Sequence, residues 1–330
     1  MEDLGRIKLF THNDLDGVGC AVVATHAYGK DVDITYCNYG DKPDGINTLM
    51  EKFLSEHKYN DYSAILITDM SVSPEHAEVL NDLFINHEVT VRLLDHHATA
   101  EWLNKYEWAN VETSRGDHLM CGTSLLFDYI WSEDKEFLES HPYLPEFVDL
   151  VESYDTWRWE KEENIMAKYL NDYLRLYGIK KFITRMLFCF NYHSKKDAIT
   201  LIDNYDLEIL QTLDKRLYDY IDELTKIVYI TPVNIGGITY KTGVIITADQ
   251  NVSVIGNVLC KKYPEADFFT IVTPNSSMIS FRTIHDHINV GEIAKRLGGG
   301  GHAKASGVGI NTIYEMFSNL VITLIQNKGQ

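Results

Sequence analysis

RIKLFTHNDLDGVGCAVVATH, residues 6–26, is the stretch that decides the fold class. It begins with a short apolar run, Arg6–Phe10, and then passes through the polar residues His12-Asn13-Asp14. An apolar segment, Gly17–His26, follows and predicts a buried helix. A short strand that ends in a polar turn and leads straight into a helix is the start of a βαβ unit.

The same alternation continues through the first half of the chain. Further strand-like runs lie at Asp33–Tyr39, Ser63–Thr68 and Val89–Leu94. Between the last two, Ser73–Asn86 has apolar residues at helical spacing, with Pro74 at a plausible first turn. Strands that alternate with helices predict an α/β domain with a doubly wound parallel sheet.

We expect this α/β domain to cover residues 1–175, followed by a helical connector at 176–231 and a smaller α/β domain at 232–330. The connector has helical patterning and no enrichment in Gly, Pro or Ser, which argues against a flexible linker. The smaller domain is predicted from three strands and two helices: Tyr240–Thr247, Phe268–Thr273, Ser277–Arg282, Val290–Leu297 and Ile313–Gln326.

Composition excludes several classes of protein. The 330 residues carry a formal net charge of −18 at pH 7, which argues against a basic groove for long duplex nucleic acid but not against a short anionic substrate. The five cysteines have no paired spacing, which favours a reducing compartment. No run approaches the roughly 18 apolar residues of a membrane span, and Met1–Arg6 does not resemble a signal peptide. We therefore expect a cytoplasmic protein without membrane contact.

Carboxylates and histidines form four clusters in the first half of the chain. They are His12-Asn13-Asp14-Leu15-Asp16-Gly17, Asp69, Asp95-His96-His97 and Asp155. Three of them lie where predicted strands end, and ligands of doubly wound sheets bind beyond the carboxyl ends of the strands. Oxygen ligands mixed with imidazole suit Mn²⁺ or Mg²⁺ better than zinc or copper. Together the clusters could hold two divalent ions that share one carboxylate, as in displacement at phosphorus.

Individual members carry different weight. Asp69 follows the most apolar strand and is our candidate for the bridging carboxylate. His96 and His97 would point to opposite sides of an extended chain, so that one binds metal and the other faces substrate. Asp95 could fix the tautomer of an imidazole by accepting its N–H. Asp155 alone is more simply interpreted as an exposed helical Asp.

A glycine-rich segment is the most specific feature of the second half. It reads Gly298-Gly299-Gly300-Gly301-His302-Ala303-Lys304-Ala305-Ser306-Gly307. Consecutive glycines allow backbone N–H groups to approach an anion closely, which suggests that Gly299, Gly300, Gly301, His302, Lys304 and Ser306 bind phosphate or a nearby sugar. A flexible hinge is the simpler alternative. Arg282, at a strand end, is a candidate bidentate partner for phosphate.

Taken together, these motifs resemble the DHH phosphoesterase family, whose name is the triplet Asp95-His96-His97. All four N-terminal motifs occur in order, and the glycine-rich segment is similar to the signature of the DHH-associated C-terminal domain, with Arg282 at that domain's substrate-binding Arg position. The length and layout are similar to the nanoRNase and oligoribonuclease branch.

The resemblance implies two Mn²⁺ ions, with Mg²⁺ or Co²⁺ as alternatives. His12, Asp14 and Asp69 would hold one ion, and Asp16, Asp69, His96 and Asp155 the other. His97, Asp95 and Asp69 would serve catalysis, with His97 on the scissile phosphate. The second domain would bind the substrate end through Arg282, the glycine loop and His302.

The activity implied is hydrolysis of short oligonucleotides to nucleoside 5′-monophosphates. Cyclic or linear dinucleotides and 3′-phosphoadenosine 5′-phosphate are alternative substrates that the sequence does not separate. A non-catalytic nucleic-acid-binding module is a further alternative, and a homodimer is left open.

Overall fold

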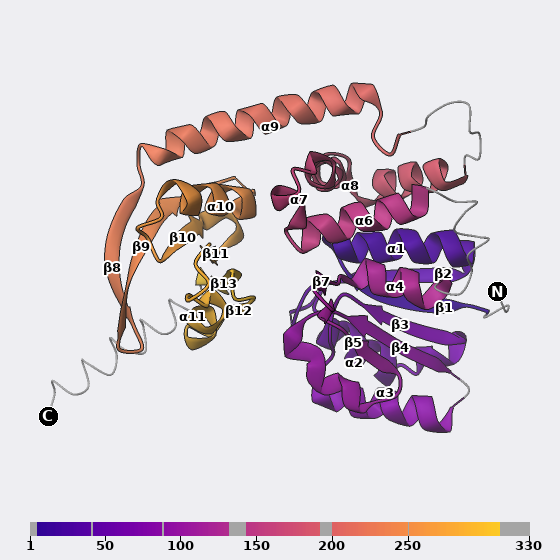
Figure 1. Cartoon of the computed structure of the whole chain (residues 1–330). Coiled ribbons are helices and arrows are strands. Elements are labelled where there is room, and N and C mark those ends of the chain that lie inside the picture. Colours follow the sequence, from indigo (N-terminus) through magenta and orange to yellow (C-terminus); the bar gives the residue numbers. More distant parts are fainter. Residues whose placement is uncertain are drawn as a thin grey trace, which may run out of the picture. The chain divides into compact units, whose positions relative to one another are not determined.

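A computed structural model describes residues 5–40, 42–87, 89–131, 143–191, 200–249 and 251–310 (Figure 1). The chain divides into two compact units, residues 1–210 and 211–330, and each is described by itself. The division lies inside the segment 176–231 that the sequence analysis treats as a connector. Within the described residues, no helix combines the length and the apolar character of a membrane-spanning segment.

The first unit is built on a five-stranded parallel sheet of order β2-β1-β3-β4-β5. Its strands are Ile7–His12 (β1), Val32–Cys37 (β2), Ala64–Thr68 (β3), Thr90–Asp95 (β4) and Ala109–Val111 (β5). Thr68 pairs with Thr11 on one side and with Leu94 on the other, so β1, β3 and β4 end nearly level. The predicted doubly wound parallel sheet is confirmed, and β5 is a strand that the sequence analysis did not predict.

Helices cover both faces of this sheet (Figure 1). On one face, Leu15–Tyr28 (α1) and Gly122–Trp131 (α4) lie on the sheet. Tyr143–Asp155 (α6) and Ile165–Asn191 (α8), which is interrupted at Gly178, pack on α1. The other face carries Ile46–Ser55 (α2) and Pro74–Asn86 (α3). Each face of the sheet has its own hydrophobic core. Successive residues of β1 point to opposite faces, so Leu9 packs in the core on the α1 side and Phe10 in the core on the α2 side.

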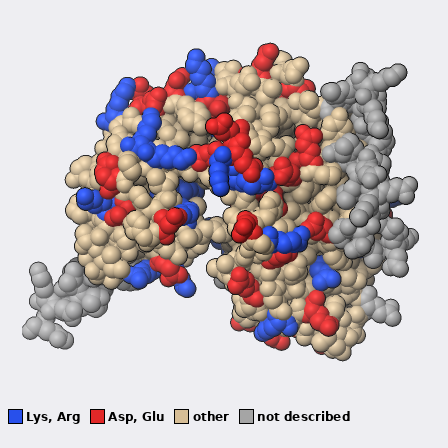
Figure 2. All heavy atoms as spheres, in the orientation of Figure 1, with Lys and Arg blue, Asp and Glu red and all other residues tan. Residues whose placement is uncertain are grey.

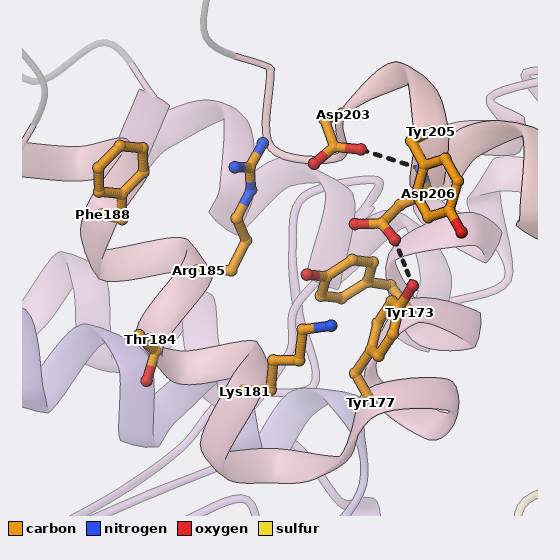
Figure 3. A pocket seen from close by; sticks show the side chains of 9 residues that line it. All are labelled: Tyr173, Tyr177, Lys181, Thr184, Arg185, Phe188, Asp203, Tyr205 and Asp206. Carbon is orange, nitrogen blue, oxygen red and sulfur yellow. Dashed lines mark hydrogen bonds between the residues drawn. The ribbon is translucent and has the colours of Figure 1, made fainter.

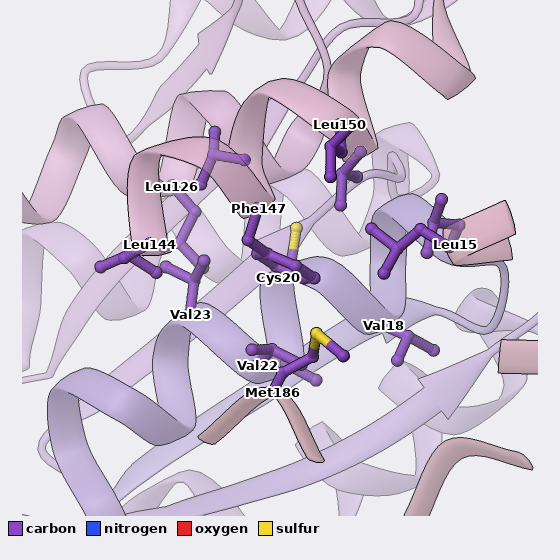
Figure 4. Close-up of a cluster of buried hydrophobic side chains, with 14 of the residues drawn as sticks. Leu15, Val18, Cys20, Val22, Val23, Leu126, Leu144, Phe147, Leu150 and Met186 are labelled. Atoms are coloured by element: carbon purple, nitrogen blue, oxygen red, sulfur yellow. The ribbon is translucent and has the colours of Figure 1, made fainter. Parts of the chain in front are cut away.

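Helix α1 is the centre of the larger core (Figure 4). Val18 and Val22 are fully buried, as are Phe147 of α6 and Met186 of α8. The helix begins where Asp14 accepts the backbone N–H of Gly17 at 3.1 Å, an N-cap bond. A helix buried on nearly all sides fixes its first turn rigidly, and that turn carries Asp16.

Shorter elements connect these layers. The 3₁₀ turns are Gly29–Asp31 (η1), Lys58–Asp61 (η2) and Ala98–Lys105 (η3), and a small hairpin pairs Ser114–Arg115 (β6) with His118–Leu119 (β7). Helix α7 (Arg158–Lys161) lies between α6 and α8, and α9 (Asn204–Thr225) extends across the boundary of the two units.

The second unit has a six-stranded mixed sheet of order β12-β13-β11-β10-β9-β8. The strands are Tyr229–Ile235 (β8), Ile238–Ile246 (β9), Phe268–Thr273 (β10), Met278–Arg282 (β11), Gly300–Gly301 (β12) and Ala305–Gly309 (β13). Helices Val252–Lys262 (α10) and Val290–Arg296 (α11) pack on it, and Pro274–Ser276 (η4) joins β10 to β11.

The three strands and the first helix predicted for this region are present, with small shifts in their bounds. Four elements were missed: β8, α10, β12 and β13. Strand β8 contains Pro232, which breaks the strand pattern in sequence but is tolerated because β8 is at the edge of the sheet. Helix α10 was also not predicted. The predicted helix Ile313–Gln326 lies outside the described residues.

Candidate functional site

The carboxyl edge of the parallel sheet gathers the carboxylates and imidazoles of all four clusters. His12 ends β1, Asp14 caps α1, and Asp16 lies in the first turn of α1. Asp69 follows β3, Asp95 ends β4, and Asp155 ends α6. Residues from four separate parts of the chain thus meet because the strands of a parallel sheet end at one edge.

A first group of possible metal ligands consists of His12, Asp14 and Asp69, whose ligand atoms lie within 4.8 Å of one another. His12 Nδ1 is 2.9 Å from Asp14 Oδ2 and 3.8 Å from Asp69 Oδ2. The chain turns at Asn13, so Asp14 meets His12 from the helix cap and not from an extended strand.

A second group consists of Asp16, His96 and Asp155, again within 4.8 Å. His96 Nε2 lies 3.7 Å from Asp16 Oδ2, 3.6 Å from Asp155 Oδ2 and 3.4 Å from Asp69 Oδ1. Asp69 therefore faces the first group with Oδ2 and the second group with Oδ1. This is the placement that a bridging carboxylate requires.

Asp69 reaches this position through an unusual backbone conformation. Its φ is 56°, in the left-handed region, and its N–H donates to Leu94 O at 3.0 Å. Such a conformation costs on the order of 1 kcal/mol or more in most residues, and Asp tolerates it better than most. The fold holds Asp69 at the junction of the two groups at the expense of local strain.

The start of helix α4 fixes Asp16, a feature that the sequence analysis missed. Asp16 accepts the N–H of Gly122 at 2.6 Å and the N–H of Thr123 at 2.7 Å, and it is almost fully buried. A helix N-terminus offers free N–H groups and partial positive charge, so it stabilises a buried carboxylate. The segment Cys121-Gly122-Thr123-Ser124 has the composition of a helix start, which is the signal that could have identified it.

Asp95 is a buried partner of His97. Its Oδ1 lies 2.7 Å from His97 Nδ1 and also accepts the backbone N–H of His96 at 2.8 Å. The expectation that His96 and His97 point to opposite sides was wrong, because their ring centroids are 4.3 Å apart. The strand ends at Asp95, so the alternation of an extended chain does not apply to the two histidines.

Tyr39 is a second residue of the site that the sequence analysis did not select. Its hydroxyl lies 3.2 Å from His97 Nε2, and its ring is 4.8 Å from the ring of His12. In the sequence Tyr39 appears only as the end of a strand-like run, so nothing marks it as functional before the fold is known.

The electrostatics of the cluster fit a cation. Among the described residues, Asp69 Oδ2 and His96 Nε2 are buried and have no hydrogen-bond partner. Burial, followed by the charges of Asp16 and Asp14, raises the pKa of Asp69 well above its ordinary value. Burial also raises the pKa of Asp155 to about 7. Crowded carboxylates with unused lone pairs are what a divalent ion neutralises, and the mixed oxygen and imidazole donors suit Mn²⁺ or Mg²⁺.

Arg282 of the second unit is held by its neighbours. Its guanidinium donates to Phe281 O at 2.8 Å, to Ser306 O at 3.3 Å and to Ser253 Oγ at 2.9 Å. The side chain is half-buried, and these bonds keep it close to β11 and β13.

The glycine-rich segment has a structural explanation that the sequence analysis did not foresee. Gly300 and Gly301 form strand β12 and pair with Gly307 and Ser306. A Cβ at Gly299 would collide with Gly307 O, and Gly301 has φ 133° and lies against Ser306. The close approach of this segment to β13 therefore requires glycine at positions 299 and 301.

The remaining predicted contacts of this segment differ in exposure. His302 and Lys304 are exposed, and Lys304 Nζ lies 2.8 Å from Asp286 Oδ1. Ser306 is buried, and its hydroxyl donates to Val290 O at 2.6 Å. The Ser306 hydroxyl thus links β13 to the start of α11, and its position does not offer it to a ligand.

A separate pocket of about 460 Å³ lies between α8 and the start of α9 (Figure 3). Its charged groups are engaged within the fold. Asp206 accepts the hydroxyl of Tyr177, Arg185 donates to Leu201 O and Thr200 O, and Lys181 Nζ is 3.4 Å from the centre of the Tyr177 ring. On the molecular face drawn in Figure 2, Lys and Arg are interspersed with Asp and Glu.

Known proteins resemble this chain in sequence and in fold. No family model matches it. The chain is 38% identical over 312 residues to oligoribonuclease NrnB of Bacillus subtilis (strain 168), and the alignment covers 94% of this chain and 74% of that protein.

Among solved structures, the chain is similar to the DHH domain of a member of the S1p family of ribosomal proteins, with TM-score 0.52, 14% identity, and coverage of 97% of this chain and 87% of that one. It is also similar to exonuclease RecJ bound to manganese, with TM-score 0.50, 14% identity, and coverage of 94% and 86%.

Proposed function

The chain belongs to the DHH phosphoesterase family, and on this premise we propose that it hydrolyses short oligonucleotides to nucleoside 5′-monophosphates. The observation that carries the proposal is the position of Asp69 between two sets of ligands, with one oxygen toward His12 and the other toward His96. Hydrolysis at phosphorus by a pair of divalent ions requires the ions to lie close together, and a shared carboxylate can hold them there.

Two divalent cations, with Mn²⁺ as our first choice, fit the two groups. His12, Asp14 and Asp69 would hold one ion, and Asp16, Asp69, His96 and Asp155 the other. When bound, the ions would lower the pKa of coordinated water and offset the charge that develops on the phosphoryl oxygens. Gly122 and Thr123 support this set by keeping Asp16 in place.

His97 is the protein group that we assign to the scissile phosphate. A carboxylate only accepts hydrogen bonds, so the bond to Asp95 places a proton on Nδ1. Nε2, beside the Tyr39 hydroxyl, is then the nitrogen that would meet the substrate. Burial opposes the imidazolium, but the hydrogen bond and charge of Asp95 outweigh it and raise the pKa of His97. The raised pKa favours the imidazolium, in which Nε2–H can donate a hydrogen bond to a phosphate oxygen.

The second unit would supply an anion-binding surface. We propose that Arg282, His302 and Lys304, together with the backbone of Gly300 and Gly301, bind a phosphate at the end of the substrate. The expected contact from the N–H of Gly299 is excluded, because that group donates to Ala294 O at 2.8 Å. A net charge of −18 favours substrates short enough to be held by a few local contacts. The name of the relative NrnB, an oligoribonuclease, agrees with this class of substrate.

The experiment is a digest of end-labelled RNA and DNA oligonucleotides of graded length, with and without Mn²⁺. We expect Mn²⁺-dependent release of nucleoside 5′-monophosphates, fastest from the shortest chains. Cyclic and linear dinucleotides and 3′-phosphoadenosine 5′-phosphate are assayed beside them. Faster hydrolysis of one of these compounds would change the substrate without changing the site.

Asp69→Ala should abolish hydrolysis and leave the fold intact, because the loss of one of several crowded like charges offsets the added strain of alanine in the left-handed backbone. Asp82→Ala, an exposed Asp on α3, is the matched control and should keep full activity. Full activity of Asp69→Ala would refute the shared carboxylate. Nucleic-acid binding that needs no metal and is unchanged in Asp69→Ala would indicate a binding module instead of an enzyme.

A further inference from the structure

Tyr39 lies among the proposed ligands although it comes from a different loop. It follows β2, the strand beside β1, and its ring lies 4.8 Å from the His12 ring and 5.8 Å from the His97 ring, measured between centroids. Its hydroxyl is 3.2 Å from His97 Nε2 and 3.4 Å from Asp69 O. Tyr39 is 45% exposed, so a ligand can approach the same place.

The loop that carries Tyr39 is closed by hydrogen bonds at its base. Asn38 N donates to Asp44 O at 2.8 Å, Ile46 N donates to Asn38 O at 2.8 Å, and the Asn38 side chain donates to Asp44 Oδ2 at 2.5 Å. These bonds attach the residue before Tyr39 to the start of α2. The phenol is therefore presented from a fixed support.

His97 has partners on both sides of its ring. Asp95 Oδ1 binds Nδ1 at 2.7 Å, and the Tyr39 hydroxyl meets Nε2 at 3.2 Å. One hydrogen bond still allows the imidazole to rock about the bonded nitrogen. A second bond at the opposite nitrogen restricts that motion and fixes the direction of Nε2.

We propose that Tyr39 is a positioning residue: its hydroxyl donates to Asp69 O and accepts the Nε2–H of His97, which orients the imidazole so that the same N–H can be shared with a scissile-phosphate oxygen of a short oligonucleotide. The proposal rests on the proposed function, since it presumes that His97 contacts the phosphate. The hydroxyl acts through His97, while its bond to Asp69 O keeps the phenol itself in place. Tyr39 is the residue that connects the loop after β2 to the chemistry at the ends of β1 and β4.

A double-mutant cycle between Tyr39→Phe and His97→Ala tests the proposal. We expect Tyr39→Phe to lower kcat on a dinucleotide by about ten- to a hundredfold, the size expected for one hydrogen bond to a charged group, and to leave Mn²⁺ affinity unchanged. In the His97→Ala background, the same change should have no further effect. Tyr59→Phe is the matched control, because it removes a tyrosine–histidine bond of 2.9 Å to His57 Nδ1 away from the site.

A second cycle uses binding in place of turnover. A phosphorothioate dinucleotide that resists hydrolysis is titrated into wild type, both single variants and the double variant. Tyr39→Phe should weaken binding severalfold only when His97 is present. Equal losses in both backgrounds, or no loss in either, would overturn the positioning role.

The two proposals fail in different ways. If the wild-type protein hydrolysed none of the nucleotides, the proposed function would fail, and the binding cycle would still decide the role of Tyr39. If Tyr39→Phe lowered Mn²⁺ affinity, the phenol would act on the ligand set and not through His97, which would also overturn the proposal.

Discussion

Asp69 and Gly122 illustrate how single residues define the site. Asp69 adopts a left-handed backbone conformation. Because Gly122 has no side chain, the side chain of Asp69 can occupy the space beside it. A Cβ at Gly122 would lie 2.7 Å from Asp69 Cβ and 3.0 Å from Asp16 Oδ2. One missing methyl group therefore allows two carboxylates of different ligand groups to approach the same helix end.

The substitution Gly122→Ala should move both carboxylates. We expect the free energy of unfolding to fall by roughly 1–3 kcal/mol, as for overpacking of a buried position, and Mn²⁺ affinity to fall with it. Chemical denaturation and metal titration measure the two quantities. Alanine is otherwise favoured over glycine in a helix, so a more stable protein with unchanged Mn²⁺ affinity would show that the close approach is not required.

Residue types and order were enough to predict most of this cluster. His12, Asp14, Asp16, Asp69, Asp95, His96, His97 and Asp155 were selected from sequence, and the structure brings them together. Gly122 and Tyr39 were missed because their roles arise from packing. The role of Gly122 depends on its contact with Asp69 and Asp16, and the role of Tyr39 depends on its contact with His97 and His12. These contacts join distant segments of the chain and cannot be inferred from the sequence.

At the scale of elements, the ends of the strands could be predicted from the sequence, but the strand pairing within the glycine-rich segment could not. Apolar runs that stop at Asp69 or Asp95 predicted β3 and β4 closely, because a buried parallel strand leaves a clear pattern. The glycine run was interpreted from its composition as an anion-binding loop. The pairing of β12 with β13 could not be inferred, because glycine has no side-chain pattern that reveals a strand.

Ser306 and Lys304 should separate the structural and binding roles of this segment. Ser306→Ala leaves Val290 O without its 2.6 Å partner, and we expect the free energy of unfolding to fall by roughly 1 kcal/mol. Lys304→Ala removes an exposed ion pair, which should change stability little and instead raise the KM for dinucleotides.

Urea denaturation and steady-state kinetics of the two variants test this division. The prediction fails if Lys304→Ala leaves the KM unchanged, or if Ser306→Ala raises the KM without lowering stability. In the first case the anion-binding surface of the second unit would have to exclude Lys304.

At the scale of the whole molecule, folding without metal concentrates negative charge in one place. The pKa of Asp155 rises to about 7 from an ordinary value of 3.8, mainly through burial and then through the charges of Asp16 and Asp14, against the opposing charge of His96. A carboxyl group whose pKa is raised by folding stabilises the native state only while it is protonated. The metal-free protein should therefore lose stability as the pH rises from about 4 to about 7.

Divalent ions should reverse this loss, because they bind the deprotonated carboxylates. We expect Mn²⁺ to raise the Tm much more at pH 8 than at pH 5, as measured by calorimetry with Mn²⁺ and with EDTA. Asp155→Asn removes the titrating group, so the metal-free Tm of that variant should depend less on pH and Mn²⁺ should stabilise it less. An equal increase in Tm with Mn²⁺ at both pH values would mean that the ion binds away from the buried carboxylates. The assignment of Asp155 as a ligand would then be wrong.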